Sequence, residues 1–395
     1  MNTVQEQGVA GEEAPSSLPV ESFWRDVLRV YGTGIHPALA LCLRHRGEVV
    51  LDRVVGVVDP SQPADEANRA TPDTLFNLFS ASKILTATVV HALVERGQLD
   101  LEERVGETLP AFARGDKADI RLRHLLQHTA GMPHMPPDLH PEDALHDIPG
   151  VVARLATMPL RFAPGTGLAY HAMSSWALIS EMIRHRLGRD LRSLAQELVT
   201  GPMGLNQFNY GVSDADLPRV ARHVTAGWQG VPIMESVFRR TVGISSAEAV
   251  RFSNTPAFLQ AILPSANVIA TPRETSAFLQ MLLDGGSWRG ARILAPETTR
   301  RMVEDETPRA FDGTFGFPMR YGLGVMKGGR RFSLFGPSTR RAFGHLGFSN
   351  VLVYADPDRE LVMVLLNTGK PLLAWGMVPW ALMVQRLALV VPRVG

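Results

Sequence analysis

Residues 76–83 read FNLFSASK, and residues 84–96 follow with good helix formers and neither glycine nor proline. The pattern predicts a helix that begins at Ser80. Because positions i and i+3 of a helix share a face, the Ser80 hydroxyl and the Lys83 amine can meet there. A serine hydroxyl needs an adjacent base before it can attack a substrate, and the amides at a helix start favour a developing anion. The pair is therefore a candidate nucleophile with its base, and the alternative is that Ser80 only caps the helix.

Two stretches further along the chain supply candidate partners for this pair. Residues 168–172 read LAYHA, and a lysine near a tyrosine favours its phenolate, which makes Tyr170 a candidate base. Residues 343–348 read FGHLGF on a predicted strand, whose glycines permit the close approach of a substrate. The Phe348 amide is a candidate to form an oxyanion hole together with the serine amide. Taken alone, Tyr170 and His345 are better interpreted as structural residues.

The composition is that of an ordinary globular protein. The chain has 395 residues, of which 45% are hydrophobic and 20% are charged, and this length suggests two structural lobes. The net charge of +1, from 40 basic and 39 acidic residues, gives no indication of nucleic acid or an anionic membrane as a partner. Cys42 is the single cysteine, so no intrachain disulfide can form. Its strand-like surroundings predict a buried, inert thiol.

The two ends of the chain carry no clear targeting signal. Residues 1–18 are polar and are predicted to be disordered, without the apolar region of a secretory signal. Residues 372–391 are apolar, but Pro379 interrupts them and Gln385 and Arg386 lie among them. A helix packed on the core is therefore expected there, in place of a membrane span. We expect a cytoplasmic protein.

Strand patterns occur at both ends of the chain and helical patterns occur between them. The predicted strands are residues 39–44, 49–55, 341–344, 350–354 and 361–367, the first two joined by a hairpin at 46–47. The predicted helices include residues 20–31, 150–158, 174–187 and 271–284. Residues 131–150 are expected to be irregular and to line a cleft, and residues 213–256 give no clear pattern.

This order predicts an α+β fold with one antiparallel sheet built from both chain ends, flanked by helices, with an inserted helical domain. We expect a sheet domain from residues 19–79 and 262–395 and a mainly helical domain from residues 80–261. The candidate site would lie at their interface.

Other candidate sites are weaker. His124 and His128 have the i, i+4 spacing of two metal ligands, but no glutamate lies between them and no third ligand is evident, so no metal is expected. Residues 32–34 read GTG and lack the third glycine of a dinucleotide-binding loop. Residues 243–247 read GISSA and match only half of a nucleophile elbow.

Taken together, the motifs at residues 80–83 (SASK), 170–172 (YHA) and 345–347 (HLG) resemble the serine β-lactamase-like superfamily in order and approximate spacing. The similarity is greatest to its class C-like branch, the family VIII carboxylesterases and related acyltransferases. The segments at residues 97–110, 122–132 (LRHLLQHTAGM) and 321–324 (YGLG) support this similarity, so that the resemblance covers roughly residues 20–390.

The resemblance implies a β-lactamase-like fold and a role for each motif. It implies that Ser80 is the nucleophile and that Lys83 and Tyr170 form the proton-transfer pair. His345 and Gly347 are then expected in the wall of the site, beside the oxyanion hole formed by the Ser80 and Phe348 amides. No cofactor is implied.

Two departures from the family pattern point to the substrate. Related lactamases and peptidases carry Asn where this chain has Ala172, and Lys-Thr/Ser-Gly where it has residues 345–347. An imidazole with its ordinary pKa of about 6.5 and a leucine supply neither a fixed charge nor a hydroxyl for a substrate carboxylate. We therefore expect a neutral ester with a short- to medium-chain acyl group. Residual β-lactam binding should strengthen below about pH 6.5, where His345 would gain a charge.

Alternatives remain open at this point. The acyl-enzyme on Ser80 is common to hydrolysis and to acyl transfer to an alcohol or amine. Activity like that of a β-lactamase or a D-alanyl-D-alanine peptidase is another alternative, as is an inactive scaffold, although the joint presence of Ser80, Lys83 and Tyr170 argues against the last. The expected partner is a small-molecule ester, with neither nucleic acid nor a membrane, and the sequence leaves open whether the chain forms a homo-oligomer.

Overall fold

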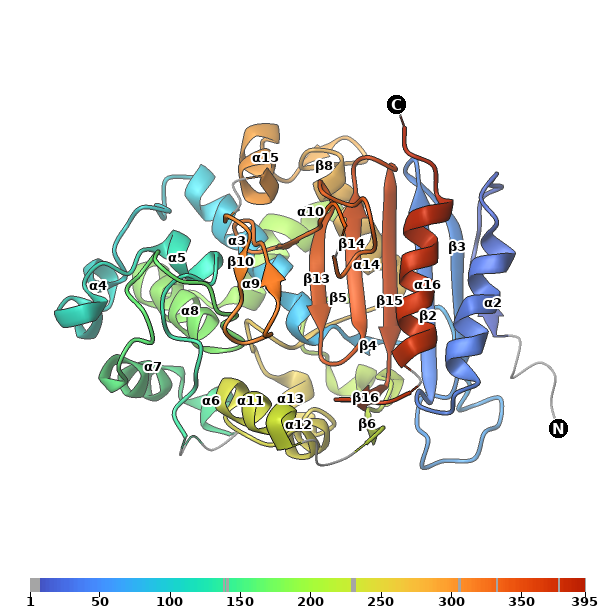
Figure 1. Ribbon diagram of the computed structural model, residues 1–395, viewed down its shortest axis with the longest axis horizontal. Coiled ribbons are helices and arrows are strands. Elements are labelled where there is room, and N and C mark those ends of the chain that lie inside the picture. The colour runs from blue at the N-terminus through green and yellow to red at the C-terminus, as the bar shows by residue number, and fades with distance from the viewer. Residues whose placement is uncertain are drawn as a thin grey trace.

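The computed structural model describes residues 8–137, 139, 142–228, 232–304, 307–331, 333–375 and 377–394. Within this part of the chain, the largest sheet has seven strands in the order β1-β3-β2-β15-β14-β13-β12, and all neighbours are antiparallel. The strands are β1 (Val9–Ala10), β2 (Ala38–His45), β3 (Glu48–Gly56), β12 (Met326–Lys327), β13 (Phe343–Gly347), β14 (Val351–Asp356) and β15 (Leu361–Asn367). The sheet is thus assembled from both ends of the chain, as the sequence predicts (Figure 1).

Both faces of this sheet are covered by helices. Helices α2 (Val20–Tyr31) and α16 (Met377–Val390) pack on one face, and α14 (Pro272–Leu283) packs on the other (Figure 1). Because successive side chains of a strand point to opposite faces, Leu41 faces α2 and α16 whereas its neighbour Cys42 faces α14. Double coverage explains why the central strands are continuous apolar runs in the sequence. Burial also raises the pKa of the Cys42 thiol to about 12, in agreement with the inert thiol predicted.

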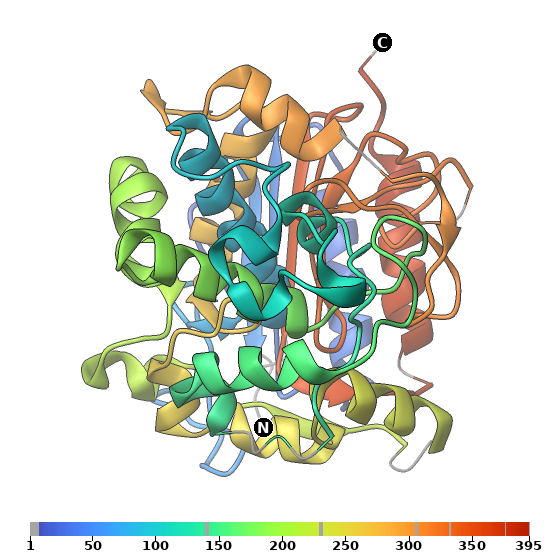
Figure 2. The ribbon, with the colours of Figure 1, turned by 90° about the vertical axis from the view of Figure 1, so that its left-hand side faces the viewer.

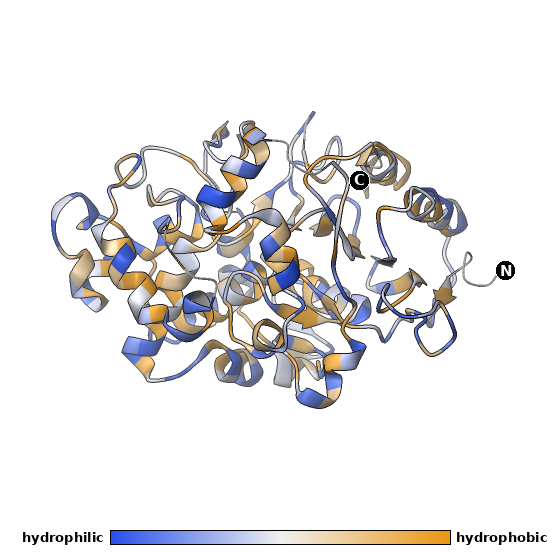
Figure 3. Cartoon of the chain, turned by 90° about the horizontal axis from the view of Figure 1, so that it is seen from below, coloured by the Kyte–Doolittle hydropathy of each residue, from blue (hydrophilic) through white to orange (hydrophobic). Residues whose placement is uncertain are grey.

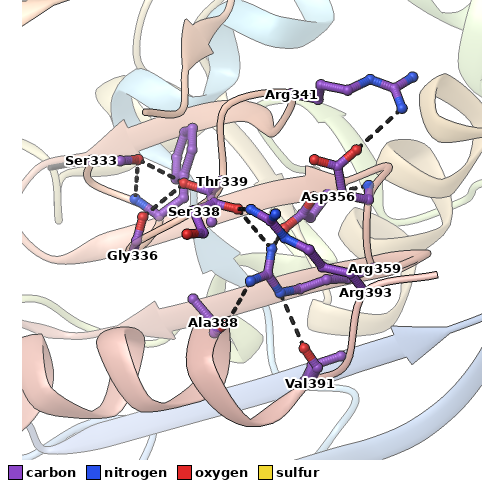
Figure 4. Close-up of polar contacts among 12 residues, drawn as sticks. Ser333, Gly336, Ser338, Thr339, Arg341, Asp356, Arg359, Ala388, Val391 and Arg393 are labelled. Carbon is purple, nitrogen blue, oxygen red and sulfur yellow. Dashed lines mark hydrogen bonds and ion pairs between the residues drawn. The ribbon is translucent and has the colours of Figure 1, made fainter. Parts of the chain in front are cut away.

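The C-terminal helix is anchored to the sheet by one buried arginine. Arg359, after β14, donates to the carbonyls of Ala388 (2.5 Å) and Val391 (3.2 Å) at the end of α16 and pairs with Asp356 at 2.7 Å (Figure 4). The outer side of α16 remains apolar, since Leu382 is 63% exposed, and this helix is mainly orange in Figure 3 beside the bluer α2.

The middle of the chain forms a helical region beside the end of the sheet that carries β13 and β12, and these helices lie in front of the sheet in Figure 2. Its main helices are α3 (Lys83–Glu95), α5 (Leu122–Leu126), α7 (Ile148–Thr157), α8 (Ser174–Leu187) and α9 (Leu191–Ala195). Helix α3 is buried from Lys83 to Leu93 because it lies between this region and the sheet. One hydrophobic core includes residues of both parts, so the division into two domains stays a prediction.

A small sheet closes the junction of the two parts, in the order β4-β7-β5, formed by β4 (Phe76–Asn77), β7 (Val268–Ala270) and β5 (Phe208–Tyr210). A parallel pair joins β6 (Val224–Ala226) to β16 (Gly369–Pro371). The other described helices and helical turns are α4 (Val105–Thr108), Pro110–Phe112, Gly115–Lys117, α6 (Asp143–His146), Gln196–Thr200, α10 (Gly201–Met203), Asp214–Arg219, α11 (Pro232–Val242), α12 (Ser246–Phe252), α13 (Pro256–Gln260) and α15 (Pro296–Glu304). The remaining short strands are β8 (Ser287–Trp288), β9 (Ala291–Arg292), β10 (Ala310–Phe311) and β11 (Pro318–Met319).

Three sequence predictions require correction. The expectation that residues 131–150 are irregular is wrong where α6 (Asp143–His146) lies and where α7 begins at Ile148. The prediction of disorder over residues 1–18 is wrong for residues 8–18, because β1 pairs with β3 and the Glu13 carboxylate accepts hydrogen bonds from the Asp52 amide and from Arg53. Residues 1–7 lie outside the described part. Pro379 does not interrupt the terminal helix, because it is the third residue of α16, in the first turn, where a proline costs no intrahelical bond. In the described part of the chain, no helix has the length and apolar character needed to cross a membrane.

Candidate active site

The structure brings Ser80 and Lys83 together. A 3₁₀ turn, Phe79–Ser82, leads directly into α3, and the Lys83 amine (Nζ) lies 3.0 Å from the Ser80 hydroxyl (Oγ). The same amine donates to the Ser265 carbonyl at 3.0 Å. These two contacts fix the amine between the start of α3 and the loop before β7.

Burial decides the protonation of Lys83. The side chain is 0% exposed, and the loss of hydration lowers the pKa of its amine well below the ordinary value of 10.5. The rings of Tyr170 and Trp176 lie 5.2 Å and 5.6 Å from the amine. Burial therefore shifts Lys83 toward the neutral amine, which is the form that can accept a proton from Ser80.

Tyr170 lies against this pair, but its protonation differs from the one expected. Burial raises the pKa of the Tyr170 phenol, and the nearby Ser80 hydroxyl opposes this effect only in part. No hydrogen bond of normal geometry joins the phenol to any described residue. The expectation that the lysine charge favours the phenolate is wrong, because the same burial disfavours the charged form of Lys83. The resting tyrosine is thus a neutral phenol that can donate or relay a proton.

Asp312 holds the backbone of Tyr170 in place. This fully buried residue accepts a hydrogen bond from the Tyr170 amide at 3.2 Å and from the Tyr321 hydroxyl at 2.7 Å. On the other side of the same residue, the Thr314 hydroxyl donates to the Tyr170 carbonyl at 3.0 Å. Asp312 is distant in the sequence and belongs to none of the motifs, so no sequence pattern indicates its role.

His128 holds the residues on either side of Tyr170. Its carbonyl accepts from the Ala169 amide at 3.2 Å, and its ring nitrogen Nδ1 accepts from the His171 amide at 3.1 Å. Its ring lies 4.8 Å from the Tyr170 ring. Burial lowers the pKa of His128 well below 6.5, which keeps the ring nitrogen able to accept. His128 lies in the segment 122–132, but its spacing from His124 suggested only a possible metal ligand.

His345 forms part of the wall beside Tyr170. Its ring lies 5.9 Å from the Tyr170 ring, and its Nδ1 is 2.7 Å from the Leu346 carbonyl. Burial, and to a smaller extent Lys83, lower the pKa of His345 to about 3. The expected gain of charge below about pH 6.5 is therefore wrong, because the buried imidazole stays neutral throughout that range.

Strand β13 approaches the serine segment where it contains Gly347. A Cβ atom at Gly347 would lie 2.4 Å from the Leu78 carbonyl oxygen, so that only a glycine permits this approach. Next to it, the Phe348 ring meets the Phe79 ring edge-on at 5.5 Å. The residues on either side of the candidate oxyanion hole are therefore packed together.

Phe79, immediately before Ser80, has a strained backbone with a φ of +46°. Its ring is held by the buried Lys370 amine at 4.7 Å and by the His223 ring at 4.7 Å. Burial lowers the pKa of Lys370 well below 10.5 and that of His223 well below 6.5. This packing fixes the direction of the Ser80 amide, and no motif in the sequence indicates it.

The structure gives other candidate residues local roles. The Ser245 hydroxyl caps α12, and the Ser246 hydroxyl donates to Glu235 at 2.6 Å. The His124 ring accepts from the Arg121 amide at 3.1 Å, at the start of α5. Among the described residues, no group of three or more His, Cys, Asp or Glu side chains is arranged to hold a metal ion.

Comparisons with known proteins identify the family to which the chain belongs. The esterase/beta-lactamase LipL of Mycobacterium tuberculosis is 28% identical over 302 residues, which are 73% of this chain and 68% of that protein. Esterase EstB of Burkholderia gladioli is 30% identical over 205 residues, about half of each protein (47% and 50%). The crystal structure of a family VIII carboxylesterase has a TM-score of 0.78 and 25% identity, with 95% of this chain and 98% of that one covered. Residues 25–378 match the family model described as Beta-lactamase, and the chain therefore belongs to the Beta-lactamase family.

Proposed function

We propose that this protein is a serine esterase that hydrolyses neutral carboxylic esters through an acyl-enzyme on Ser80. The observation that carries the proposal is the contact of 3.0 Å between the Ser80 hydroxyl and the fully buried Lys83 amine, whose pKa is well below its ordinary value. An adjacent neutral base activates a hydroxyl nucleophile. The names of the related proteins, which include esterases, support the same class.

The first half-reaction acylates the serine. Lys83 takes the Ser80 proton as Oγ attacks the ester carbonyl, and the Ser80 and Phe348 amides stabilise the oxyanion. When the ester C–O bond breaks, the proton held by Lys83 passes through the Tyr170 hydroxyl to the departing alkoxide, which leaves as an alcohol. Water then repeats the sequence against the acyl-enzyme, so that a carboxylic acid leaves and Ser80 regains its proton.

The wall residues support a neutral substrate. Ala172 has no side-chain amide to bind a substrate amide, and Leu346 and the neutral His345 have no charge to pair with a carboxylate. A carboxylate beside these residues would lose hydration without compensation. We therefore propose esters over penicillins and peptides as the substrates.

Covalent labelling tests the nucleophile directly. A fluorophosphonate should label the wild-type protein at Ser80, as peptide mass spectrometry can show, and should not label Ser80→Ala. Ser246→Ala is the matched control, because its hydroxyl is occupied by Glu235, and it should label and turn over p-nitrophenyl butyrate like the wild type. Labelling at another residue, or ester turnover by Ser80→Ala above about a tenth of the wild-type rate, would refute the proposal.

A further inference from the structure

The exposed apolar side chains of the protein are concentrated in three segments near the candidate site. In the described part of the chain, every large apolar side chain that is exposed belongs to Trp228 with α11, to the β10–β11 hairpin, or to residues 373–390 with α16. The exposed fraction is 79% at Ile233 in α11, 66% at Phe311 in β10 and 75% at Trp375 before α16. Figure 1 shows α11, β10 and α16 on three sides of β13. We call these three segments the apolar rim.

Each segment of the apolar rim contacts the candidate site, or the chain next to it, through its inner side. The Phe238 ring of α11 lies 4.8 Å from the Phe348 ring, and the Phe315 ring of the hairpin lies 4.9 Å from the Tyr170 ring. In α16, the Trp380 indole donates to a backbone carbonyl two residues after Phe348, at 3.1 Å. The outer side chains of the rim therefore surround the candidate site.

The outward charges of the apolar rim are basic. Its two acidic residues, Glu235 and Asp312, accept hydrogen bonds from other side chains of the protein. Exposed arginines lie at positions 239 and 240 of α11 and at position 393, after α16. The net charge of +1 averages over the whole chain, so the sequence analysis did not indicate a basic surface here and expected no membrane as a partner.

A second basic segment lies against the rim. The loop at residues 329–341 contains four arginines and no acidic residue. It packs on the C-terminal half of α16, where a Cβ atom at Gly336 would lie 2.6 Å from the Ala388 Cβ. Arg393 donates to the Ser338 carbonyl of this loop (Figure 4). The exposed apolar side of α16 is therefore bordered by positive charge.

We propose that the apolar rim and this basic loop bind the surface of an anionic lipid bilayer, with the candidate site facing the lipid. An apolar surface with a basic border binds such interfaces. The Trp228 and Trp375 indoles, which meet edge-on at 5.7 Å, have the mixed apolar and polar character favoured there. A second copy of the chain fits less well, because a two-fold contact would place one basic surface against another. The binding is independent of the proposed esterase function.

Vesicle sedimentation tests the apolar part of the proposal. The wild type should bind vesicles of phosphatidylcholine mixed with phosphatidylglycerol. Leu382→Glu removes an exposed apolar contact of α16 and adds a repelled charge, so it should weaken this binding at least about tenfold. Gln98→Glu is the matched control, because it adds the same charge at an exposed position after the end of α3, outside the rim. It should stay within about twofold of the wild type.

The choice of lipid tests the charges. The wild type should bind phosphatidylcholine vesicles at least about tenfold more weakly than the mixed vesicles. Replacing the exposed pair Arg330 and Arg331 by glutamine should weaken binding to the mixed vesicles at least about tenfold, since each arginine near an anionic surface contributes about fivefold. Equal binding of the wild type to both kinds of vesicle would refute the anionic surface.

The other outcomes are also decisive. Absence of sedimentation, or a Leu382→Glu variant that binds like the wild type, would overturn the proposal. Analytical ultracentrifugation without lipid tests the second copy, and a dimer that Leu382→Glu dissociates would assign the rim to contacts between chains instead. Should Leu382→Glu not fold by circular dichroism, Trp375→Ser decides in its place. Ser80→Ala should bind vesicles like the wild type, so that failure of the esterase proposal leaves this test intact.

Discussion

The packing of Asp312 against Tyr170 leads to a prediction that separates positioning from chemistry. Asp312 contacts no reacting group, but its carboxylate accepts hydrogen bonds from the amides of Tyr170 (3.2 Å), Thr314 (2.8 Å) and Phe315 (2.9 Å) and from the Tyr321 hydroxyl (2.7 Å). The substitution Asp312→Ala leaves these donors without their acceptor. It should therefore lower both the stability of the fold and the accuracy with which the Tyr170 phenol faces Ser80.

The magnitudes follow from the number and burial of these donors. Each buried donor left unsatisfied costs about 1–3 kcal/mol, and water entering the vacated space recovers part of this, so we expect a loss of about 3–5 kcal/mol in the free energy of unfolding. A displacement of a proton-transfer group by about 1 Å lowers kcat by about 10²-fold. Asp312→Asn keeps the acceptor oxygen for the amides and should stay within about tenfold of the wild-type kcat.

The assay combines p-nitrophenyl butyrate kinetics with urea unfolding of the same samples. Asp356→Ala is the matched control, because Asp356 is equally buried and hydrogen-bonded to Arg359 but lies far along the sheet, at the end of β14. It should lower stability with kcat unchanged. In the Tyr170→Phe background, Asp312→Ala should lower kcat by less than about threefold further, because it acts through the phenol. A full additional 10²-fold loss in that background would refute the positioning role.

The remaining predictions concern the chemistry and the substrate. Ser80→Ala should lower kcat for p-nitrophenyl butyrate by about 10⁶-fold, with the circular dichroism spectrum unchanged. Lys83→Ala and Tyr170→Phe should each lower kcat severely, and the double variant should lose little more than either single variant, since both residues act on one proton path. Additive losses of kcat would show separate roles. Because the proposed base Lys83 must be the neutral amine and burial lowers its pKa, kcat/KM should fall as pH decreases through that pKa and stay constant above it; a rise toward acid would contradict the neutral base. With the pKa of His345 at about 3, nitrocefin turnover should show no improvement between about pH 8 and about pH 5.5, and nitrocefin turnover equal to that of the ester would overturn the esterase proposal.

Local rules were sufficient for the elements with strong sequence periodicity. The helices at residues 20–31 and 174–187 were predicted with the bounds that the structure shows. The hairpin between β2 and β3 and the strand at residues 361–367 were also predicted. The meeting of Ser80 and Lys83 was predicted from the i, i+3 spacing on an α-helix that begins at Ser80. The helix in fact begins at Lys83, and Ser80 lies in the preceding 3₁₀ turn, where residues i and i+3 also share a face.

Contacts across long stretches of sequence were not predictable in the same way. Residues 8–18 are held in place by hydrogen bonds from the Asp52 amide and Arg53 to Glu13. A polar segment without hydrophobic periodicity gives no sign of such contacts. The supports of Tyr170 come from residues 128 and 312, which the fold brings to it from both sides. The depressed pKa of His345 depends on burial, which a single strand motif does not specify.

The neutrality of four buried side chains near Ser80 links the burial of the site to its proposed substrate. Lys83, Tyr170, His128 and His345 are all shifted by burial toward their neutral forms. In the proposed reaction, these groups gain charge only when Ser80 attacks, as an oxyanion at the amides and an ammonium on Lys83, and each stabilises the other in a medium of low dielectric constant. A substrate carboxylate held there would stabilise the Lys83 ammonium before the attack and remove the base. In the proposed reaction, the same burial that favours the neutral amine of Lys83 thus selects against anionic acyl groups, and a neutral ester is the substrate that keeps the base active.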